Sequence, residues 1–269
     1  MRLFDAHNHL HDERLPGTPE ELIAECTSQG VVATVVNGAC EGDWDAVLSI
    51  AQAHRCVVPS FGYHPWYIVE ASPDWRDALV SKLRAIPSGV GEIGIDRWRT
   101  EFDPKKQEEI FMTQVEIAQQ EDRPMSIHGL RAWGRLYDLL RSVRIPSCGF
   151  VLHSYGGPRE MVPQFAKLGA YFSCPGFFLS PGREMKLAVF EHVPQDRLLL
   201  ETDAPDQPLP EDLNRYDLPA NTDGRRLNHP ANIRAVYEGF AAARGLELGT
   251  LSEQIERNFR ALFGSVLRV

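Results

Sequence analysis

Short apolar runs, rich in β-branched residues, alternate along the chain with longer stretches in which apolar residues recur at helical spacing. Each short run is bounded by Gly, Pro or polar residues. Parallel strands that are covered on both faces have this continuous apolar character. We therefore predict eight buried strands, which begin near Arg2, Val31, Cys56, Gly89, Pro124, Cys148, Gly169 and Arg197.

Helices are predicted between these strands. Thr18-Pro19 and Asp103-Pro104 each place a capping oxygen before a proline, which is typical of the first turn of a helix. The weakest helical spacing is that of Gly182–Glu191, and a long polar loop follows the eighth strand. The other predicted helices include Thr18–Gln29, Asp43–His54, Asp74–Ile86, Pro104–Gln120, Ala132–Val143 and, beyond the polar loop, about Pro230–Arg244 and Leu251–Phe263.

Strict alternation of strands and helices favours a parallel sheet, and eight such units favour a closed (β/α)8 TIM barrel. An open, doubly wound sheet is the alternative fold. No G-x-G-x-x-G pattern follows the first strand, which weakens the dinucleotide-binding version of that alternative. The length of 269 residues suits one barrel domain that spans residues 1–269.

Composition bears on the compartment and on the partners. Five scattered cysteines without a C-x-x-C pair favour free thiols, and the N-terminal segment lacks the apolar stretch of a secretory signal, so we expect a cytoplasmic location. No window approaches the roughly 20 apolar residues of a membrane helix, so no membrane partner is expected. The net charge of −9 argues against broad non-specific binding of nucleic acid. A phosphate substrate is still allowed, because two divalent cations would outweigh the carboxylates of one pocket.

Metal-capable side chains lie at the ends of five predicted strands. A lone histidine or a lone H-x-H is a weak signal, but the C-terminal ends of all strands meet at one mouth of a barrel, where active sites are built. We therefore predict that six side chains converge there and hold metal. They are His7 and His9 on the first strand, Glu92 on the fourth, His128 on the fifth, His153 on the sixth and Asp203 on the eighth.

The spacing of these residues suggests a division into two ion sites. His7 and His9 share one face of a strand because side chains two residues apart point the same way. With Asp203 they would hold one ion. The same rule places Asp5 and Glu201 one layer deeper, where we expect them to accept hydrogen bonds from imidazole N–H groups.

A second ion would lie on the other side of the mouth. His128 and His153 come from neighbouring strands and could bind it together. Glu92 lies between the two groups, and one carboxylate can bridge metals that are about 3.5–4 Å apart.

The loop after the third strand carries candidate substrate contacts. His64, in Gly62-Tyr-His-Pro-Trp, is predicted to contact a phosphate or a leaving group, because loops at this end of a barrel concentrate such contacts. Tyr63 and Trp66 are predicted to offer a surface on which a base can stack.

Taken in order, several segments resemble the TatD family of metal-dependent deoxyribonucleases. The resemblance spans almost the whole chain and ends at Asn258-Phe-Arg-Ala-Leu-Phe. The segments are Asp5-Ala-His-Asn-His-Leu, Gly62-Tyr-His-Pro, Gly91-Glu-Ile-Gly-Ile-Asp, Leu152-His-Ser-Tyr-Gly-Gly and Glu201-Thr-Asp-Ala-Pro.

This resemblance implies a (β/α)8 fold and the hydrolysis of phosphodiester bonds in DNA with divalent cations. By motif position it implies one metal at His7, His9, Glu92 and Asp203, and a second at Glu92, His128 and His153.

The chain also departs from the family pattern. His128-Gly-Leu-Arg131 stands where relatives commonly have Ser-Arg after the histidine, so the arginine contact with substrate is either shifted to Arg131, as we expect, or lost. Ser-Tyr-Gly-Gly follows His153 where a Cys-Phe-type pair is usual, and the loop between Pro205 and Asn228 is longer. These departures are compatible with a divergent subgroup that has its own substrate.

The expected reaction is a two-metal hydrolysis of phosphodiesters, with single strands or ends of DNA preferred. Asp203 would orient the attacking water and accept its proton, Glu92 would bridge the ions, and His64 would contact the phosphate or the leaving oxygen. The two divalent cations could be Zn, Mn, Fe, Co, Ni or Mg, although Mg matches four histidines poorly. The alternatives are hydrolysis of an amide, ester or lactone, including deacylation of aminoacylated nucleic acid, and a non-enzymatic binding barrel. The sequence leaves the oligomeric state open.

Overall fold

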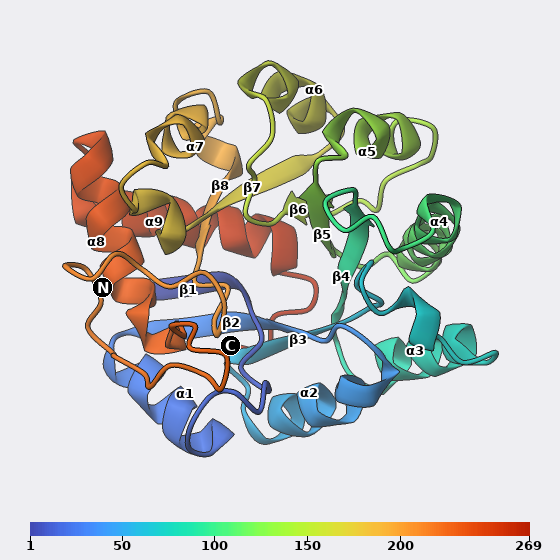
Figure 1. Ribbon diagram of the computed structural model, residues 1–269, viewed down its shortest axis with the longest axis horizontal. Helices are drawn as coiled ribbons and strands as arrows, with labels where there is room; N and C mark the ends of the chain where they lie inside the picture. Colours follow the sequence, from blue (N-terminus) through green and yellow to red (C-terminus); the bar gives the residue numbers. More distant parts are fainter.

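Eight parallel strands follow one another in chain order around a barrel, and the helices form a ring outside it (Figure 1). The structure is a computed structural model that describes all 269 residues. It confirms the predicted (β/α)8 barrel and excludes the doubly wound open sheet. The strands are β1 (Leu3–Asn8), β2 (Val31–Asn37), β3 (Val57–Phe61), β4 (Gly89–Asp96), β5 (Met125–Leu130), β6 (Phe150–Leu152), β7 (Ala170–Pro175) and β8 (Leu198–Glu201).

The outer ring consists of longer α-helices and short 3-10 turns. The α-helices are α1 (Pro19–Ser28), α2 (Glu41–Ala53), α3 (Trp75–Ala85), α4 (Pro104–Gln120), α5 (Trp133–Leu140), α6 (Val162–Lys167), α7 (Glu184–Ala188), α8 (Ile233–Arg244) and α9 (Leu248–Phe263). The 3-10 turns are η1 (Ile68–Glu70), η2 (Arg159–Met161), η3 (Gly176–Leu179), η4 (Val189–Glu191), η5 (Gln195–Arg197) and η6 (Pro230–Asn232).

Local chemistry explains where the predicted helices begin and where they differ. The Thr18 hydroxyl accepts from the Glu21 N–H and the Glu21 carboxylate accepts from the Thr18 N–H, so α1 begins at a capping box. The Asp103 carboxylate caps α4 in the predicted place. The helix predicted over Gly182–Glu191 is divided into α7 and η4, and the first turn predicted at Pro230 is the separate turn η6.

The barrel closes between β1 and β8 through backbone bonds beyond the end of β8. The Asp203 N–H donates to the His7 carbonyl at 2.9 Å, and the His9 N–H donates to the Ala204 carbonyl at 2.7 Å. Near the start of β1, the Tyr237 hydroxyl of α8 accepts from the Phe4 N–H and donates to the Phe4 carbonyl. Closure at the mouth therefore sets the histidines of β1 directly beside Asp203.

The long polar loop after β8 runs beside α1 and returns to the barrel at α8 (Figure 1). Its start is tied to the loop after β1, because the Arg14 guanidinium forms two hydrogen bonds with the Asp206 carboxylate. Its end is tied to α1, where the buried His229 ring lies 2.9 Å from a carboxylate oxygen of Glu25. None of the helices is both long enough and apolar enough to cross a membrane.

Candidate metal centre

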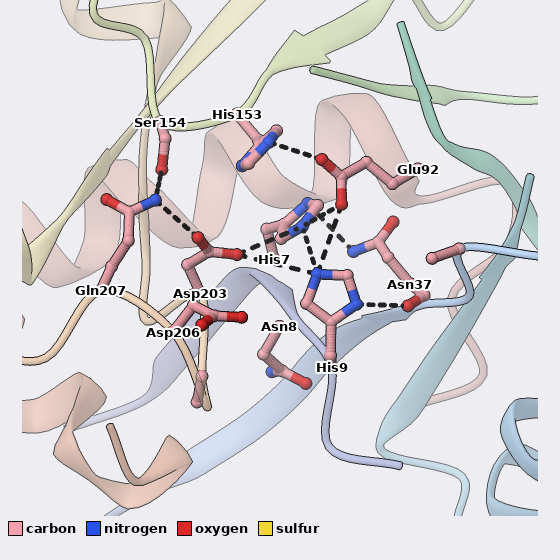
Figure 2. Close-up of polar contacts among 12 residues, drawn as sticks. His7, Asn8, His9, Asn37, Glu92, His153, Ser154, Asp203, Asp206 and Gln207 are labelled. Carbon is pink, nitrogen blue, oxygen red and sulfur yellow. Dashed lines mark hydrogen bonds and ion pairs between the residues drawn. The ribbon is translucent and has the colours of Figure 1, made fainter. Parts of the chain in front are cut away.

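The six predicted ligands converge at the mouth of the barrel, together with His64. Figure 2 shows the part of this group around Glu92 and Asp203. Neighbouring side chains lie 2.8–3.8 Å apart across the group, so the predicted convergence is confirmed as geometry. The group contains His7, His9, His64, Glu92, His128, His153 and Asp203.

Glu92 lies at the middle of this group and is almost fully buried. Its Oε2 atom lies 3.4 Å from His7 Nε2 and 3.3 Å from His9 Nε2. Its Oε1 atom lies 3.1 Å from His128 Nδ1 and 2.8 Å from His153 Nε2. The two oxygens of one carboxylate therefore face two different pairs of imidazoles, as a bridge between two ions requires.

The first pair is completed by Asp203. Its Oδ1 atom lies 3.5 Å from His7 Nε2 and 3.8 Å from His9 Nε2. Nδ1 of His9 donates to the Asn37 carbonyl at 2.7 Å, and Nδ1 of His7 lies 2.9 Å from the Ser126 hydroxyl. Partners on the outer ring nitrogens leave both Nε2 atoms directed at one centre.

The second pair uses different ring nitrogens. His128 turns Nδ1 inward because its Nε2 is held by the Asp96 carboxylate at 3.1 Å. His153 turns Nε2 inward, and its Nδ1 faces Glu201 at 3.7 Å without a hydrogen-bond partner. The hydrogen bond to Asp96 therefore fixes the orientation of His128. The His153 ring is held by stacking on the His7 ring, with the two ring centroids 4.0 Å apart.

Asp96 is a residue of this site that the sequence analysis missed. It ends β4 and is almost fully buried. Burial alone would raise the pKa of its carboxyl group, but the hydrogen bond and charge of His128, together with the hydrogen bonds from Trp98 and Trp66, outweigh burial and lower that pKa to about 2. Asp96 follows Glu92 by four residues on the same strand, so the period-two rule that identified the other ligands also indicates it.

His64 lies beside Glu92 but differs from the other imidazoles. Its Nδ1 accepts from the Trp66 N–H at 3.2 Å, so the proton of the neutral ring is on Nε2. Nε2 lies 3.5 Å from Glu92 Oε1. Burial lowers the pKa of His64 to about 3, which keeps the ring neutral. An Nε2–H group suits donation to an oxygen better than it suits metal binding.

The outer oxygen of Asp203 is held by Gln207, a second residue that the sequence analysis missed. The Gln207 amide donates to Asp203 Oδ2 at 2.5 Å and to the Ser154 hydroxyl at 2.6 Å (Figure 2). The Ser154 hydroxyl in turn donates to Glu201 at 2.6 Å. This chain of donors leaves only Oδ1 of Asp203 turned toward the imidazoles.

The two central carboxyl groups have opposite proton affinities. Burial raises the pKa of Asp203 to about 7. Burial would also raise the pKa of Glu92, but the surrounding imidazoles, His153 first, hold it well below its usual value. A pair of carboxyl groups whose pKa values are pushed apart is typical of acid–base sites, in which one group stays ionised and the other takes up a proton.

Asp5 does not have the role expected for it. Its carboxylate accepts from the side chains of Asn8 and Thr202 and from the Thr202 N–H, and no imidazole N–H reaches it. That prediction is wrong because the turn that closes the barrel occupies the carboxylate. Glu201 does lie below His153, but its hydrogen bonds come from Ser154 and Ser173.

The predicted substrate contacts fare differently. Tyr63 is 1% exposed and its hydroxyl donates to Glu41, so the prediction that it stacks on a base is wrong: the ring packs in the core between Trp44 and Trp75. Trp66 lies at the rim, with its indole N–H donating to Asp96 at 2.7 Å. Arg131 is exposed one residue beyond β5, with a left-handed backbone of φ 53°.

The donors fit divalent metal ions. Imidazole nitrogens of both pairs face the Glu92 and Asp203 carboxylates. Three sets of side chains each have ligand atoms within 4.8 Å of one another: His7, His153 and Asp203; His7, His9 and Glu92; and His64, Glu92 and His128. Four imidazoles with two carboxylates suit Zn, Mn, Fe, Co or Ni. The buried carboxylates of Glu92 and Asp203 face these imidazoles and have no Lys or Arg partner, an arrangement that suits divalent cations.

Comparison with known proteins agrees with this geometry. Residues 4–264 match the family model described as TatD related DNase. The chain is 27% identical to a 3'-5' ssDNA/RNA exonuclease TatD from Citrobacter koseri, over 97% of this chain and 99% of the relative. It is 24% identical to an uncharacterized metal-dependent hydrolase YabD from Bacillus subtilis, over 97% and 98%. The crystal structure of the TatD homolog YJJV from Escherichia coli superimposes with a TM-score of 0.88 at 24% identity, over 98% of both chains.

Proposed function

The chain belongs to the TatD-related DNase family of metal-dependent hydrolases, and on that premise we propose that it cleaves phosphodiester bonds at the ends of single-stranded DNA or RNA with two divalent cations. One observation carries the proposal. Glu92 directs one oxygen to His7 and His9 and the other to His128 and His153. A carboxylate divided in this way is placed to bridge two ions.

Each cation would have its own set of protein atoms. His7, His9 and Asp203 would hold one, His128 and His153 would hold the other, and Glu92 would bind both. When bound, such ions lower the pKa of water and neutralise the charge that builds on a phosphoryl group. The protein's part is to fix these donors, and the hydrogen bonds of Asn37 and Asp96 do so for His9 and His128.

Asp203 and His64 have complementary roles in this proposal. Asp203, whose Oδ1 atom faces His7 and His9, would orient the attacking water and accept its proton. The neutral His64 ring would donate its Nε2–H to a phosphate or leaving-group oxygen. Both side chains face Glu92, so a phosphate seated beside Glu92 would lie within reach of each.

The preference for ends follows from charge and access. The chain carries only 28 Lys and Arg and a net charge of −9, which leaves few cations to hold a duplex backbone. Affinity would come mainly from the metal centre gripping one phosphate. The printed name of the Citrobacter koseri relative, a 3'-5' ssDNA/RNA exonuclease, favours the 3′ end and includes RNA as a substrate.

A panel of nucleic acids tests the proposal. The substrates are 5′-labelled single strands of DNA and RNA, a blunt DNA duplex and a covalently closed circle, all at the same salt and metal. We expect mononucleotides to be released from the single strands faster than from the duplex, and the circle to remain closed.

Two other outcomes would contradict the proposed function. Linearisation of the closed circle without preference for ends would contradict cleavage at ends. Hydrolysis of an amide, an ester, a lactone or an aminoacylated nucleic acid, with no cleavage of the panel, would place the chain with amidohydrolase chemistry instead. The cytoplasmic location remains a prediction, in keeping with five cysteines that are all free.

A further inference from the structure

A cluster of aromatic and cationic side chains stands at the rim of the mouth beside His128. Trp66 comes from the loop after β3, and Trp98 and Arg99 come from the loop after β4. The Trp66 ring lies 6.4 Å from the His128 ring and 6.3 Å from the Trp98 ring. The three rings therefore form a path from the second pair of imidazoles outward to the surface.

Asp96 fixes this cluster to the candidate metal centre. One of its oxygens accepts from the Trp66 indole N–H and from His128, and the other accepts from the backbone N–H groups of Trp98 and Arg99. A single buried carboxylate thus positions a predicted metal ligand and the aromatic cluster together. The four hydrogen bonds that Asp96 accepts therefore tie the segment that carries Trp98 to the candidate metal centre.

The side chains of the cluster differ in how much of their surface is accessible to a ligand. The Arg99 guanidinium lies over the Trp66 ring at 4.2 Å, which covers one face of that indole. Glu101 lies 3.8 Å from Arg99, so the cation has only a loose and exposed partner. Trp98 is 50% exposed, which is unusual for the largest apolar side chain.

These features suit a nucleobase. Every base has a π-face that stacks on an indole without regard to sequence, and a neighbouring guanidinium adds attraction for the base and for its phosphate. We infer that Trp98, with the stacked pair Arg99–Trp66 beside it, binds one base of the single strand whose phosphate lies at the metal centre. The inference rests on the proposed nuclease function and gives to Trp98 the role that the sequence analysis gave to Tyr63.

The test pairs a change in the protein with a change in the substrate. Single-stranded oligonucleotides carry either normal bases or one abasic tetrahydrofuran residue, placed at the last or the last-but-one 3′ position. For each protein the ratio of kcat/KM for the normal strand to kcat/KM for the abasic strand measures the contribution of that base. We expect a ratio of about 10 for the wild type at one of the two positions. Trp98→Ala should bring the ratio close to one, and Trp98→Phe should keep most of it.

The controls separate stacking from folding. Met185→Ala removes another exposed apolar side chain, 82% exposed on α7, and should keep the wild-type ratio. Metal content and the far-UV circular dichroism of each variant show whether the barrel is intact. A wild-type ratio near one at both positions, or an unchanged ratio in Trp98→Ala, would overturn the inference while the nuclease function stands. If the wild type cleaves neither strand, the proposed function itself fails and the inference falls with it.

Discussion

Glu92 differs from the other acidic side chains of the mouth because each of its oxygens faces its own pair of imidazoles. Asp203 directs one oxygen to His7 and His9, and its second oxygen is occupied by Gln207. Removal of the Glu92 carboxylate should therefore affect the binding of both ions, whereas removal of the Asp203 carboxylate should affect mainly one. The side chains can therefore be told apart by how many ions each variant retains.

Replacing Glu92 should remove metal, whereas replacing His64 should not. In Glu92→Ala both sets of donors lose a ligand, so bound metal should fall from two ions per chain to less than one. His64→Ala should keep both ions and lose about 100-fold in kcat, because it removes a proton donor and no ligand. Elemental analysis of the purified variants gives the metal content. Two ions and wild-type turnover in Glu92→Ala would refute the bridge.

Gln207 is predicted to act through Asp203. Gln207→Leu removes the hydrogen bond to Oδ2, and because a bond to a charged group is worth about 1.5 kcal/mol or more, kcat should fall about 10-fold with KM and metal content nearly unchanged. Gln207→Glu places a second carboxylate beside Asp203, which raises the pKa of Asp203 further. Since Asp203 must be ionised to accept a proton, the acidic limb of the pH–rate profile should move to higher pH.

The control for Gln207 is Gln119→Leu on α4, whose amide nitrogen makes no hydrogen bond. It should leave both kcat and the pH profile as in the wild type. A pH profile of Gln207→Glu that coincides with the wild type would show that Gln207 does not act on Asp203.

The sequence predicts the six ligands but not the side chains that orient them. The ligands are visible because histidines and carboxylates stand at strand ends, where a barrel must bring them together. Asp96 could have been predicted from its spacing to Glu92. Gln207 could not, because its contact depends on the backbone of the loop after β8, where Asp203 and Gln207 have left-handed φ values of 54° and 52°.

Among the elements, β1 is connected both to the segment after β8 and to α8. Its histidines are tied at the mouth to the segment after β8, and Phe4 is tied to α8 by both hydrogen bonds of the Tyr237 hydroxyl. β1 therefore leads into predicted metal ligands at its C-terminal end while α8 holds its start. The hydroxyl bonds satisfy backbone groups that have no other partner on that side of β1.

Tyr237→Phe should weaken the attachment of β1 to α8 without changing the candidate metal centre. It leaves the Phe4 N–H and carbonyl buried and unpaired, so the free energy of unfolding should fall by about 2 kcal/mol. Metal content should be unchanged. Denaturant unfolding measures the effect. Tyr137→Phe is the matched control, because the hydroxyl of this half-buried side chain on α5 makes no hydrogen bond within the protein. Equal stabilities of the two variants would contradict the account of closure at β1.

Helix starts were predicted better than helix lengths. The capping signals at Thr18 and Asp103 are local, and both helices begin where they place them. The stretch Gly182–Glu191 is divided into α7 and η4, and α5 ends at Leu140, three residues before the predicted end. Helix ends depend on how each helix meets the barrel and its neighbours, which is information that spacing along the chain does not contain.

For the whole molecule, the order of elements was enough to predict the barrel, and composition was not enough to predict the substrate. Eight alternating strand and helix units leave few other topologies. The net charge of −9 is a sum over the whole chain, whereas the electrostatics of the mouth depend on a few groups around Glu92. Substrate choice depends on rim residues such as Trp98, whose exposure only the structure shows.

Stepwise metal loading with activity as the readout tests the central claim most directly. Chelated, metal-free protein is titrated with Zn or Mn, and release of mononucleotides from a 5′-labelled single strand is followed at each step. The two-ion account predicts no activity without metal and a rise that reaches its plateau at two equivalents per chain. A plateau at one equivalent, or full activity in the metal-free protein, would contradict it.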